Sequence, residues 1–185
     1  MDLDKAIEKR RSIRRFKETK KPDYRDIINA IQAATKAPLA GNISSIKYIL
    51  VSDKEKIKQL ATAAQQRFVS QVSYVVVVCT DKKTLVKNYY ERGERYARQQ
   101  AGAAIENFLL KLMDFDLDSC WTGAFDDNAV KRILKIPEDI DVEAMLPIGI
   151  AFEKPKPRRD PDLDKILWYD VWKQKEMVPQ RKFDT

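Results

Sequence analysis

The sequence predicts a layered fold of the α/β or α+β class, in which helices cover a central sheet. The first observation is the unbroken, mostly β-branched run YVVVVC at residues 74–79, which is typical of a central strand covered on both faces. The second is a series of amphipathic helical patterns on either side of this run. The third is size, because 185 residues with 44% hydrophobic content fit one compact domain better than two.

The first half of the chain alternates predicted helices with predicted strands. Residues 2–11 have helical spacing and end in a cluster of arginines. A second helix is expected from Tyr24, where apolar residues recur at helical spacing, to a stop before Pro38. Residues 47–52 predict a strand, and the capping-box pattern SDKE at residues 52–55 opens a third helix.

The second half begins with a polar stretch over residues 81–95, for which no element is predicted. A long core helix with many small residues is expected over residues 97–112. Residues 120–123 predict a strand that runs into a tight loop, residues 129–134 a short helix, and residues 144–152 another strand. Three prolines exclude regular structure from the basic segment that follows.

The composition excludes several classes of protein. No apolar run approaches the ~18–20 residues of a membrane span, and no signal core follows the charged N-terminus, so we expect a cytoplasmic protein. Histidine is absent, which excludes Ser-His-Asp triads, HExxH zinc sites and a histidine base. Cys79 and Cys120 lie in apolar stretches without CxxC spacing, so we expect buried thiols and no metal site.

The net charge of +7 and the pI near 9.3 indicate an anionic ligand or partner. Four arginines and a serine gather within residues 10–15, at the end of the first predicted helix. Guanidinium groups bind phosphate bidentately, which makes this cluster a candidate phosphate site. The alternative is a solvated helix end whose cations complement the helix dipole, and the residues alone leave both interpretations open.

Three further segments could carry binding chemistry. The loop over residues 38–45 offers an amide and hydroxyls to a polar ring, or is an ordinary connection between helix and strand. The glycine in CWTGA at residues 120–124 lets the backbone approach a ligand closely, or marks a simple turn. The basic, proline-stiffened residues 154–159 could close on a phosphate, or form an exposed loop.

Taken in order, these segments resemble the flavin-dependent nitroreductase family. The resemblance extends from about Asp4 to Lys173, which is nearly the whole chain. It rests on RRSIRRF at residues 10–16, the segment from Ala37-Pro38 to Asn42, GAAIENFLL at 102–110, CWTGA at 120–124, LPIG at 146–149 and KPRR at 156–159. No GxGxxG sequence is present, which excludes a Rossmann fingerprint.

The resemblance implies an α+β homodimer with a central mixed or antiparallel sheet flanked by helices. A single FMN-binding domain would span residues 1–175 and end in an extended C-terminal arm, with a polar tail over residues 176–185. Two FMN molecules would lie at the dimer interface. The aromatic residues of the arm, which need a surface to cover them, independently favour a dimer.

By the same resemblance, the arginine cluster and the C-terminal basic segment would hold the FMN phosphate, and the loop with Asn42 would reach the flavin of the other subunit. The backbone of residues 122–123 would lie against the isoalloxazine ring, and Gln65 matches a ribityl or pyrimidine contact. The implied cofactor-binding residues are Arg10, Arg11, Ser12, Arg14, Pro38, Leu39, Ala40, Asn42, Gln65, Trp121, Thr122, Gly123, Arg158 and Arg159.

The implied activity is that of an NAD(P)H-dependent oxidoreductase in which the flavin is the redox centre, so no catalytic side chain is expected. Hydride would pass from NAD(P)H to flavin N5 and then to an electron-poor acceptor such as a nitroaromatic or a quinone. The aromatic residues of the polar segment 81–95, with Tyr96 and Phe125, could stack on a planar acceptor, or could form a lid or a dimer contact. The alternatives are a flavin-storing or specialised-substrate member of the same fold, and a basic nucleic-acid-binding module.

Overall fold

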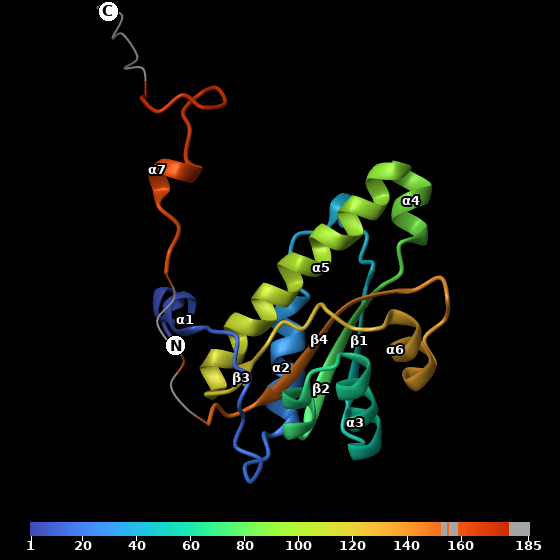
Figure 1. Cartoon of the computed structure of the whole chain (residues 1–185). Helices are drawn as coiled ribbons and strands as arrows, with labels where there is room; N and C mark the ends of the chain where they lie inside the picture. Colours follow the sequence, from blue (N-terminus) through green and yellow to red (C-terminus); the bar gives the residue numbers. More distant parts are fainter. Residues whose placement is uncertain (153–154, 156–158, 178–185) are drawn as a thin grey trace, which may run out of the picture. The chain divides into compact units, whose positions relative to one another are not determined.

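The residues described by the computed structural model (Figure 1) are 1–152, 155 and 159–177. The chain divides into two compact units, Met1–Pro155 and Lys156–Thr185, which are treated separately below. The single domain expected over residues 1–175 stays a prediction. No helix in the described ranges combines the length and the apolar composition that crossing a membrane requires.

A four-stranded antiparallel sheet forms the centre of the first unit, with its strands in the order β1-β2-β4-β3. The strands are β1 (Ile46–Val51), β2 (Tyr74–Thr80), β3 (Asp118–Ser119) and β4 (Asp141–Gly149). β2 pairs with a strand on either side, and all of its residues are buried. The prediction that residues 74–79 form a central, covered strand is therefore confirmed, and the sheet is the antiparallel one of the two types expected.

Helices cover both faces of this sheet (Figure 1). α2 (Tyr24–Ala34) and α5 (Glu91–Leu112) pack on one face, and α3 (Lys54–Ala63) and α6 (Asp127–Leu134) pack on the other. Successive side chains of a strand point to opposite faces, so the valines of β2 enter the two cores alternately. The α+β class is confirmed, with one apolar core on each side of a single sheet.

The start of α3 differs from the expected capping box. The Asp53 side chain accepts a hydrogen bond from the backbone N–H three residues later, at 2.9 Å, so Asp53 and not Ser52 is the N-cap. The capping-box prediction is wrong by one residue, and Glu55 instead pairs with Lys58 Nζ at 2.7 Å. α3 ends at Ala63 and is followed by the 3₁₀ segment η2 (Arg67–Gln71).

The polar residues 81–95, without a predicted element, form α4 (Lys83–Tyr89) and the first turn of α5. The two helices meet at Tyr90, whose φ of 53° turns the chain. A Cβ atom at Gly93 would lie 2.5 Å from the Leu85 carbonyl group, so the glycine lets the two helices pack backbone against backbone. Apolar spacing does not reveal these turns, because most of their side chains face solvent.

Two predicted strands differ in extent from the observed ones. β4 ends at Gly149 rather than Phe152, because the chain after it leaves the ladder and bridges to the N-terminal segment. The strand expected over residues 120–123 is instead β3, two residues earlier, followed by an isolated bridge from Thr122 to Met145. α5 ends in the 3₁₀ turn η3 (Met113–Phe115), which leads into β3.

The second unit is described over residues 159–177. It contains the short helix α7 (Leu163–Ile166), whose N-cap is the side chain of Asp162. The rings of Trp168 and Trp172 contact each other, with centroids 4.0 Å apart. Several large apolar side chains nevertheless stay exposed, namely Leu163, Ile166, Leu167, Val171, Trp172 and Met177.

Candidate functional site

The arginine cluster lies on an extended segment, residues 10–16, that follows α1 (Leu3–Lys9). The segment joins the sheet beside β3, since Ser12 forms a parallel bridge with Ser119 and the N–H of the next residue donates to the Ser119 carbonyl at 3.0 Å. Its apolar residues, Ile13 and Phe16, are buried. Ser12 and Arg14, which flank the buried Ile13, are exposed on the opposite side of the segment from it. We call residues 10–16 the arginine strand.

Arg10 and Arg11 have different environments. Arg10 Nε lies 3.1 Å from a carboxylate oxygen of Glu106 on α5, and the Arg10 side chain is 21% exposed. Because a guanidinium has five N–H donors, this pairing fixes Arg10 and leaves its terminal nitrogens available to an anion. The Arg11 guanidinium donates to the backbone carbonyls of Glu8 and Arg10 at the end of α1. Arg11 therefore caps the C-terminal end of α1, where its positive charge complements the helix dipole.

The CWTGA segment leads away from the point where the arginine strand joins β3. Thr122 is buried and exchanges two backbone hydrogen bonds with Met145, at 3.0 and 2.9 Å. Its neighbours Trp121 and Gly123 face solvent. Among the described residues, the Gly123 N–H has no hydrogen-bond partner. The Thr122 N–H already donates to Met145, so it is not available to a ligand. Of the two backbone N–H groups expected to meet a ligand, only that of Gly123 is a free, exposed donor among the described residues.

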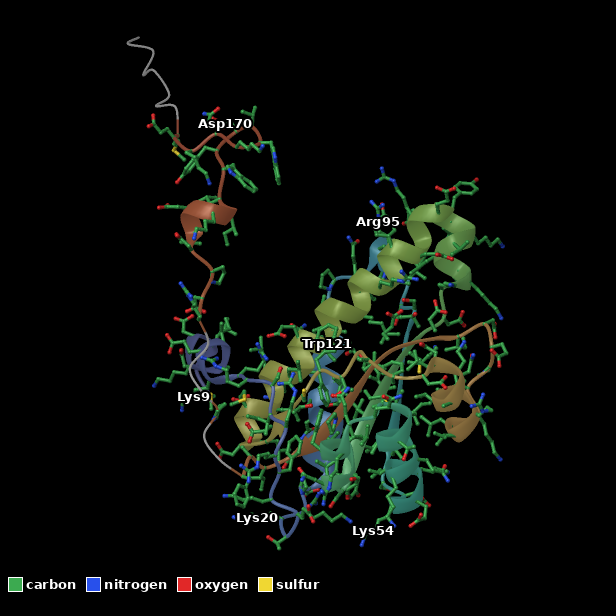
Figure 2. The ribbon with its side chains drawn as sticks, in the orientation of Figure 1. Lys9, Lys20, Lys54, Arg95, Trp121 and Asp170 are labelled. Atoms are coloured by element: carbon green, nitrogen blue, oxygen red, sulfur yellow. The ribbon has the colours of Figure 1, made fainter. Side chains whose placement is uncertain are left out.

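Trp121 connects this segment with α5 (Figure 2). A Cβ atom at Gly102 of α5 would lie 3.9 Å from Trp121 Cη2, and one at Gly123 would lie 4.0 Å from Trp121 Nε1. The indole is 40% exposed. The indole and the glycine backbone together form an exposed ledge beside α5.

Gln65 lies at a corner that is tied to the same ledge. It follows α3 with a φ of 53°, and its side chain is exposed. The next residue, Gln66, donates from Nε2 to the Ala124 carbonyl at 3.2 Å, and the Asp126 N–H donates to the Ala63 carbonyl at 2.9 Å. These bonds hold the end of α3 against the residues that follow Gly123. The corner that carries Gln65 is therefore tied to the residues that follow Gly123, and the role of Gln65 stays a prediction.

The loop with Pro38, Leu39, Ala40 and Asn42 is fixed elsewhere. It contains the 3₁₀ turn η1 (Ala40–Asn42), in which Gly41 and Asn42 have φ values of 56° and 59°. A Cβ atom at Gly41 would lie 2.3 Å from Tyr89 Oη, so the loop packs closely on α4. Asn42 is exposed. No hydrogen bond or ion pair between described residues joins this loop to the arginine strand or to Gly123.

The thiol of Cys120 is buried behind the ledge. Burial raises its pKa, and the nearby charge of Arg14 offsets this only in part. The raised pKa keeps the thiol protonated near neutral pH, so Cys120 is unsuited to act as a nucleophile. No group of three or more metal-binding side chains occurs within the ranges that the structure describes.

The last two predicted site residues belong to the C-terminal basic segment. Arg158 lies outside the described residues, and Arg159 is an exposed residue of the second unit. Glu106, the partner of Arg10, was missed by the sequence reasoning. No local spacing marks it, because Arg10 and Glu106 are far apart in sequence. The roles of all these residues toward a cofactor remain predictions.

Comparison with known proteins identifies the family. The family model described as Nitroreductase family matches residues 7–78 and 65–150. A protein of Archaeoglobus fulgidus, provisionally named NADH dehydrogenase/NAD(P)H nitroreductase, is 33% identical over 84% of this chain and 87% of its own length. An iodotyrosine deiodinase of Thermotoga neapolitana is 25% identical over 89% of this chain and 95% of its own length.

Solved structures agree with this assignment. The crystal structure of a nitroreductase family protein from Clostridium novyi NT superposes with a TM-score of 0.75 and 26% identity. The superposition covers 95% of this chain and 97% of that one. The family model and the relative that is 33% identical each span well over half of the chain. The chain therefore belongs to the Nitroreductase family.

Proposed function

We propose that this protein binds FMN and acts as an NAD(P)H-dependent oxidoreductase. The observation that carries the proposal is the bridge between Ser12 and Ser119, which joins the arginine strand to the segment that ends at Gly123. Four extended residues separate Ser119 from Gly123, a span of at most about 13 Å. A phosphate at the arginines and a flavin ring at the Gly123 N–H are thereby linked by a distance that a ribityl chain can cover.

Each part of the site has a distinct task in this proposal. Arg10, held by Glu106, and Arg14 neutralise the phosphate, and the Ser12 hydroxyl donates to it. The Gly123 N–H donates to the ring edge at which negative charge develops on reduction. Bound FMN supplies the hydride-accepting chemistry, and the absence of histidine from the chain is then unproblematic.

We also propose a homodimer. The second unit exposes six large apolar side chains, and exposed apolar surface of this kind marks protein–protein contact sites. The loop at Asn42 is held by α4 and presents its amide to solvent, away from any bond with the arginine strand. A second copy that covers the apolar residues and receives Asn42 at its flavin accounts for both observations.

The cofactor proposal is tested on the purified protein by its visible spectrum and by titration with FMN. The double variant Arg10→Gln/Arg14→Gln is expected to raise the FMN dissociation constant at least about 100-fold, since each guanidinium–phosphate bond contributes roughly 1.5–3 kcal/mol. Arg132→Gln/Lys135→Gln, at two exposed positions of α6 and its C-cap, is the control matched in charge and leaves FMN binding unchanged. Undiminished FMN binding by the double variant would refute the phosphate assignment.

The role of the Gly123 N–H needs a separate pair of variants. Gly123→Pro removes the donor, whereas Gly123→Ala keeps it and places its methyl group at ordinary contact distance from Trp121. We expect the proline variant to lower the midpoint potential of the bound flavin and the alanine variant to preserve it. Equal potentials in both variants, with FMN still bound, would exclude this hydrogen bond.

A second candidate is reductive dehalogenation, which the similarity to an iodotyrosine deiodinase favours. The identity of 25% leaves the acceptor open. An anaerobic acceptor panel separates the two candidates: nitroaromatics and quinones reoxidise the reduced protein under the main proposal, whereas iodide release from an iodophenol indicates the second. Reduction by NAD(P)H followed by no reaction with either class would point to flavin storage.

A further inference from the structure

α5 carries a row of polar residues along the face that meets Trp121. With about 3.6 residues per turn, positions spaced by three, four and seven residues share one face of a helix. Gly102 contacts the Trp121 indole, and Glu106, one turn further on, pairs with Arg10 at the other end of the candidate flavin site. In the opposite direction, the same face continues with Arg98, Arg95 and Glu91.

A surface pocket lies on this continuation of α5. Its volume is about 450 Å³, and it is lined by Glu91, Glu94, Arg95, Arg98 and Gln99. Figure 2 shows Arg95 near the N-terminal end of α5, whereas Trp121 lies beside the middle of this helix. The pocket therefore lies on the N-terminal part of α5, and its nearest lining residues, Arg98 and Gln99, are about one turn from Gly102.

The two guanidinium groups of the pocket are available to a ligand. Arg95 and Arg98 each follow a glutamate by four residues, a spacing that favours ion pairs on a helix. Nevertheless, no carboxylate among the described residues lies within 4.0 Å of either guanidinium. Glu94 instead forms an ion pair with Lys82, with 3.3 Å between Oε1 and Nζ, and Lys82 Nζ also lies 2.9 Å from Asp141 Oδ2. Only Glu91 remains as an unpaired negative charge beside the two arginines.

Because Arg95 and Arg98 lack a carboxylate partner among the described residues, we infer that the pocket binds the diphosphate of the reduced nicotinamide dinucleotide. This inference rests on the proposed function. Gly102 and Gly123 both lie beside the Trp121 indole, so a nicotinamide ring stacked on a flavin at Gly123 would lie near Gly102 of α5. At about 1.5 Å per residue, Arg98 lies about 6 Å and Arg95 about 10.5 Å further along the helix axis. Two guanidiniums at these heights match an extended dinucleotide, in which the diphosphate follows the nicotinamide riboside.

Glu91 gives the pocket a preference between the two dinucleotides. It lies about 16.5 Å from Gly102 along the axis, one turn beyond Arg95, where the adenosine ribose of the same extended ligand falls. A carboxylate accepts a hydrogen bond from a ribose 2′-hydroxyl and repels a 2′-phosphate. The pocket therefore favours NADH over NADPH.

The subsite is tested by anaerobic stopped-flow reduction of the full chain loaded with FMN. The donors are NADH, which carries two phosphates, reduced nicotinamide mononucleotide, which carries one, and 1-methyl-1,4-dihydronicotinamide, which carries none. Arg95→Gln/Arg98→Gln is expected to weaken NADH binding about 100-fold and mononucleotide binding about tenfold. The reduction rate at saturation and the reaction with the phosphate-free donor should stay within about twofold.

The phosphate-free donor separates failure of this subsite from failure of the proposed function. If that donor does not reduce the loaded wild-type protein, the oxidoreductase proposal fails, and the subsite with it. If it reduces wild type and variant equally while NADH binding is also unchanged in the variant, only the subsite is refuted. Loss of reaction with all three donors would likewise refute it, because the arginines would then act on the flavin. Arg132→Gln/Lys135→Gln, at two exposed positions of α6 and its C-cap, controls for the loss of two positive charges.

The preference for NADH has its own test. Glu91→Gln is expected to improve NADPH binding about tenfold and to weaken NADH binding about threefold, because repulsion of the 2′-phosphate and the bond to the 2′-hydroxyl are lost together. The ratio of the two dissociation constants is the measured quantity. An unchanged ratio would exclude Glu91 from the ribose end of the pocket.

Discussion

The central strand β2 and the second unit are both rich in large apolar side chains, yet the environments of those side chains are opposite. Every residue of β2 is buried between two strands and two layers of helices. In the second unit, Leu163 is 66% exposed, Trp172 74% and Met177 70%. The first unit thus completes its own apolar core, whereas the second exposes apolar surface that its own described residues do not cover.

Length explains this difference. β2 spans seven residues and joins a sheet whose neighbours supply all its partners. α7 has only four residues, fewer than an isolated helix needs for stability in water. The contact between Trp168 and Trp172 buries only part of the aromatic surface. Apolar content alone therefore does not make a core, and a segment like this needs another surface to pack against.

The largest effect is expected where the first unit is most tightly packed. Phe108 of α5 is fully buried in the core between α2, α5 and the sheet. Phe108→Ala should lower the free energy of unfolding by about 3–5 kcal/mol, because it removes buried apolar surface and leaves a cavity. Denaturant unfolding followed by circular dichroism measures this loss, which should not depend on protein concentration. A loss below about 1 kcal/mol would mean that this core is loosely packed.

The corresponding change in the second unit should act on association rather than on folding. Leu163→Glu/Trp172→Glu places charges where apolar side chains are already exposed, so the first unit keeps its stability. If a second copy covers these residues, self-association weakens at least about 100-fold. Sedimentation velocity over a range of concentrations measures it, with Lys165→Glu as the exposed control in the same helix. Unchanged association would remove the second unit from the dimer interface.

Two glycines of α5 sharpen the comparison within one element. A Cβ atom added at Gly93 would lie 2.5 Å from backbone atoms of Leu85 in α4. A Cβ atom added at Gly102 would lie no closer than 3.9 Å to a neighbouring residue. Gly93→Ala should destabilise by about 1–3 kcal/mol through overpacking, since backbone atoms cannot yield as a side chain can. Gly102→Ala should stabilise by up to about 1 kcal/mol through helix propensity. Thermal unfolding of both variants gives the signs, and equal signs would contradict the packing.

These contrasts also show which parts of the fold the sequence predicts. β2, α2 and the inner part of α5 are buried on one or both sides, so the spacing of their apolar residues predicts them from the sequence. α4 and the first turn of α5 escaped prediction because most of their side chains face water. Their packing depends on Gly93, which contributes space and no pattern.

The candidate site shows a similar limit. The arginine strand and the Gly123 segment were expected from residue types and from a family resemblance, and both have exposed donors in the structure. The pair between Arg10 and Glu106 was not expected, because its members are far apart in sequence and each alone resembles a solvated charge. The parallel bridge at Ser12 depends on the meeting of two chain segments, which local spacing does not encode.

A further effect of about the same size concerns a buried titratable group of the first unit. Cys79 of β2 is 1% exposed, and burial, with the charge of Glu143 second, raises the pKa of its thiol from 9.0 to about 11. The folded state therefore keeps a proton that the unfolded chain releases, so this contribution is complete below pH 9 and is lost as the pH rises toward 11. At pH 10 the loss is about 1.4 kcal/mol.

This loss can be isolated by comparing the wild type with Cys79→Ala from pH 8 to pH 10 in denaturant unfolding. Burial also raises the pKa of Tyr48, from 10.0 to about 12, so its own contribution is lost mainly above pH 10, outside this window. The variant is less stable at pH 8 because a buried side chain is shortened, but its stability should fall less steeply with pH. If the stabilities of wild type and variant fell equally with pH, water would reach the thiol. β2 would then be less completely buried than the comparison with the second unit assumes.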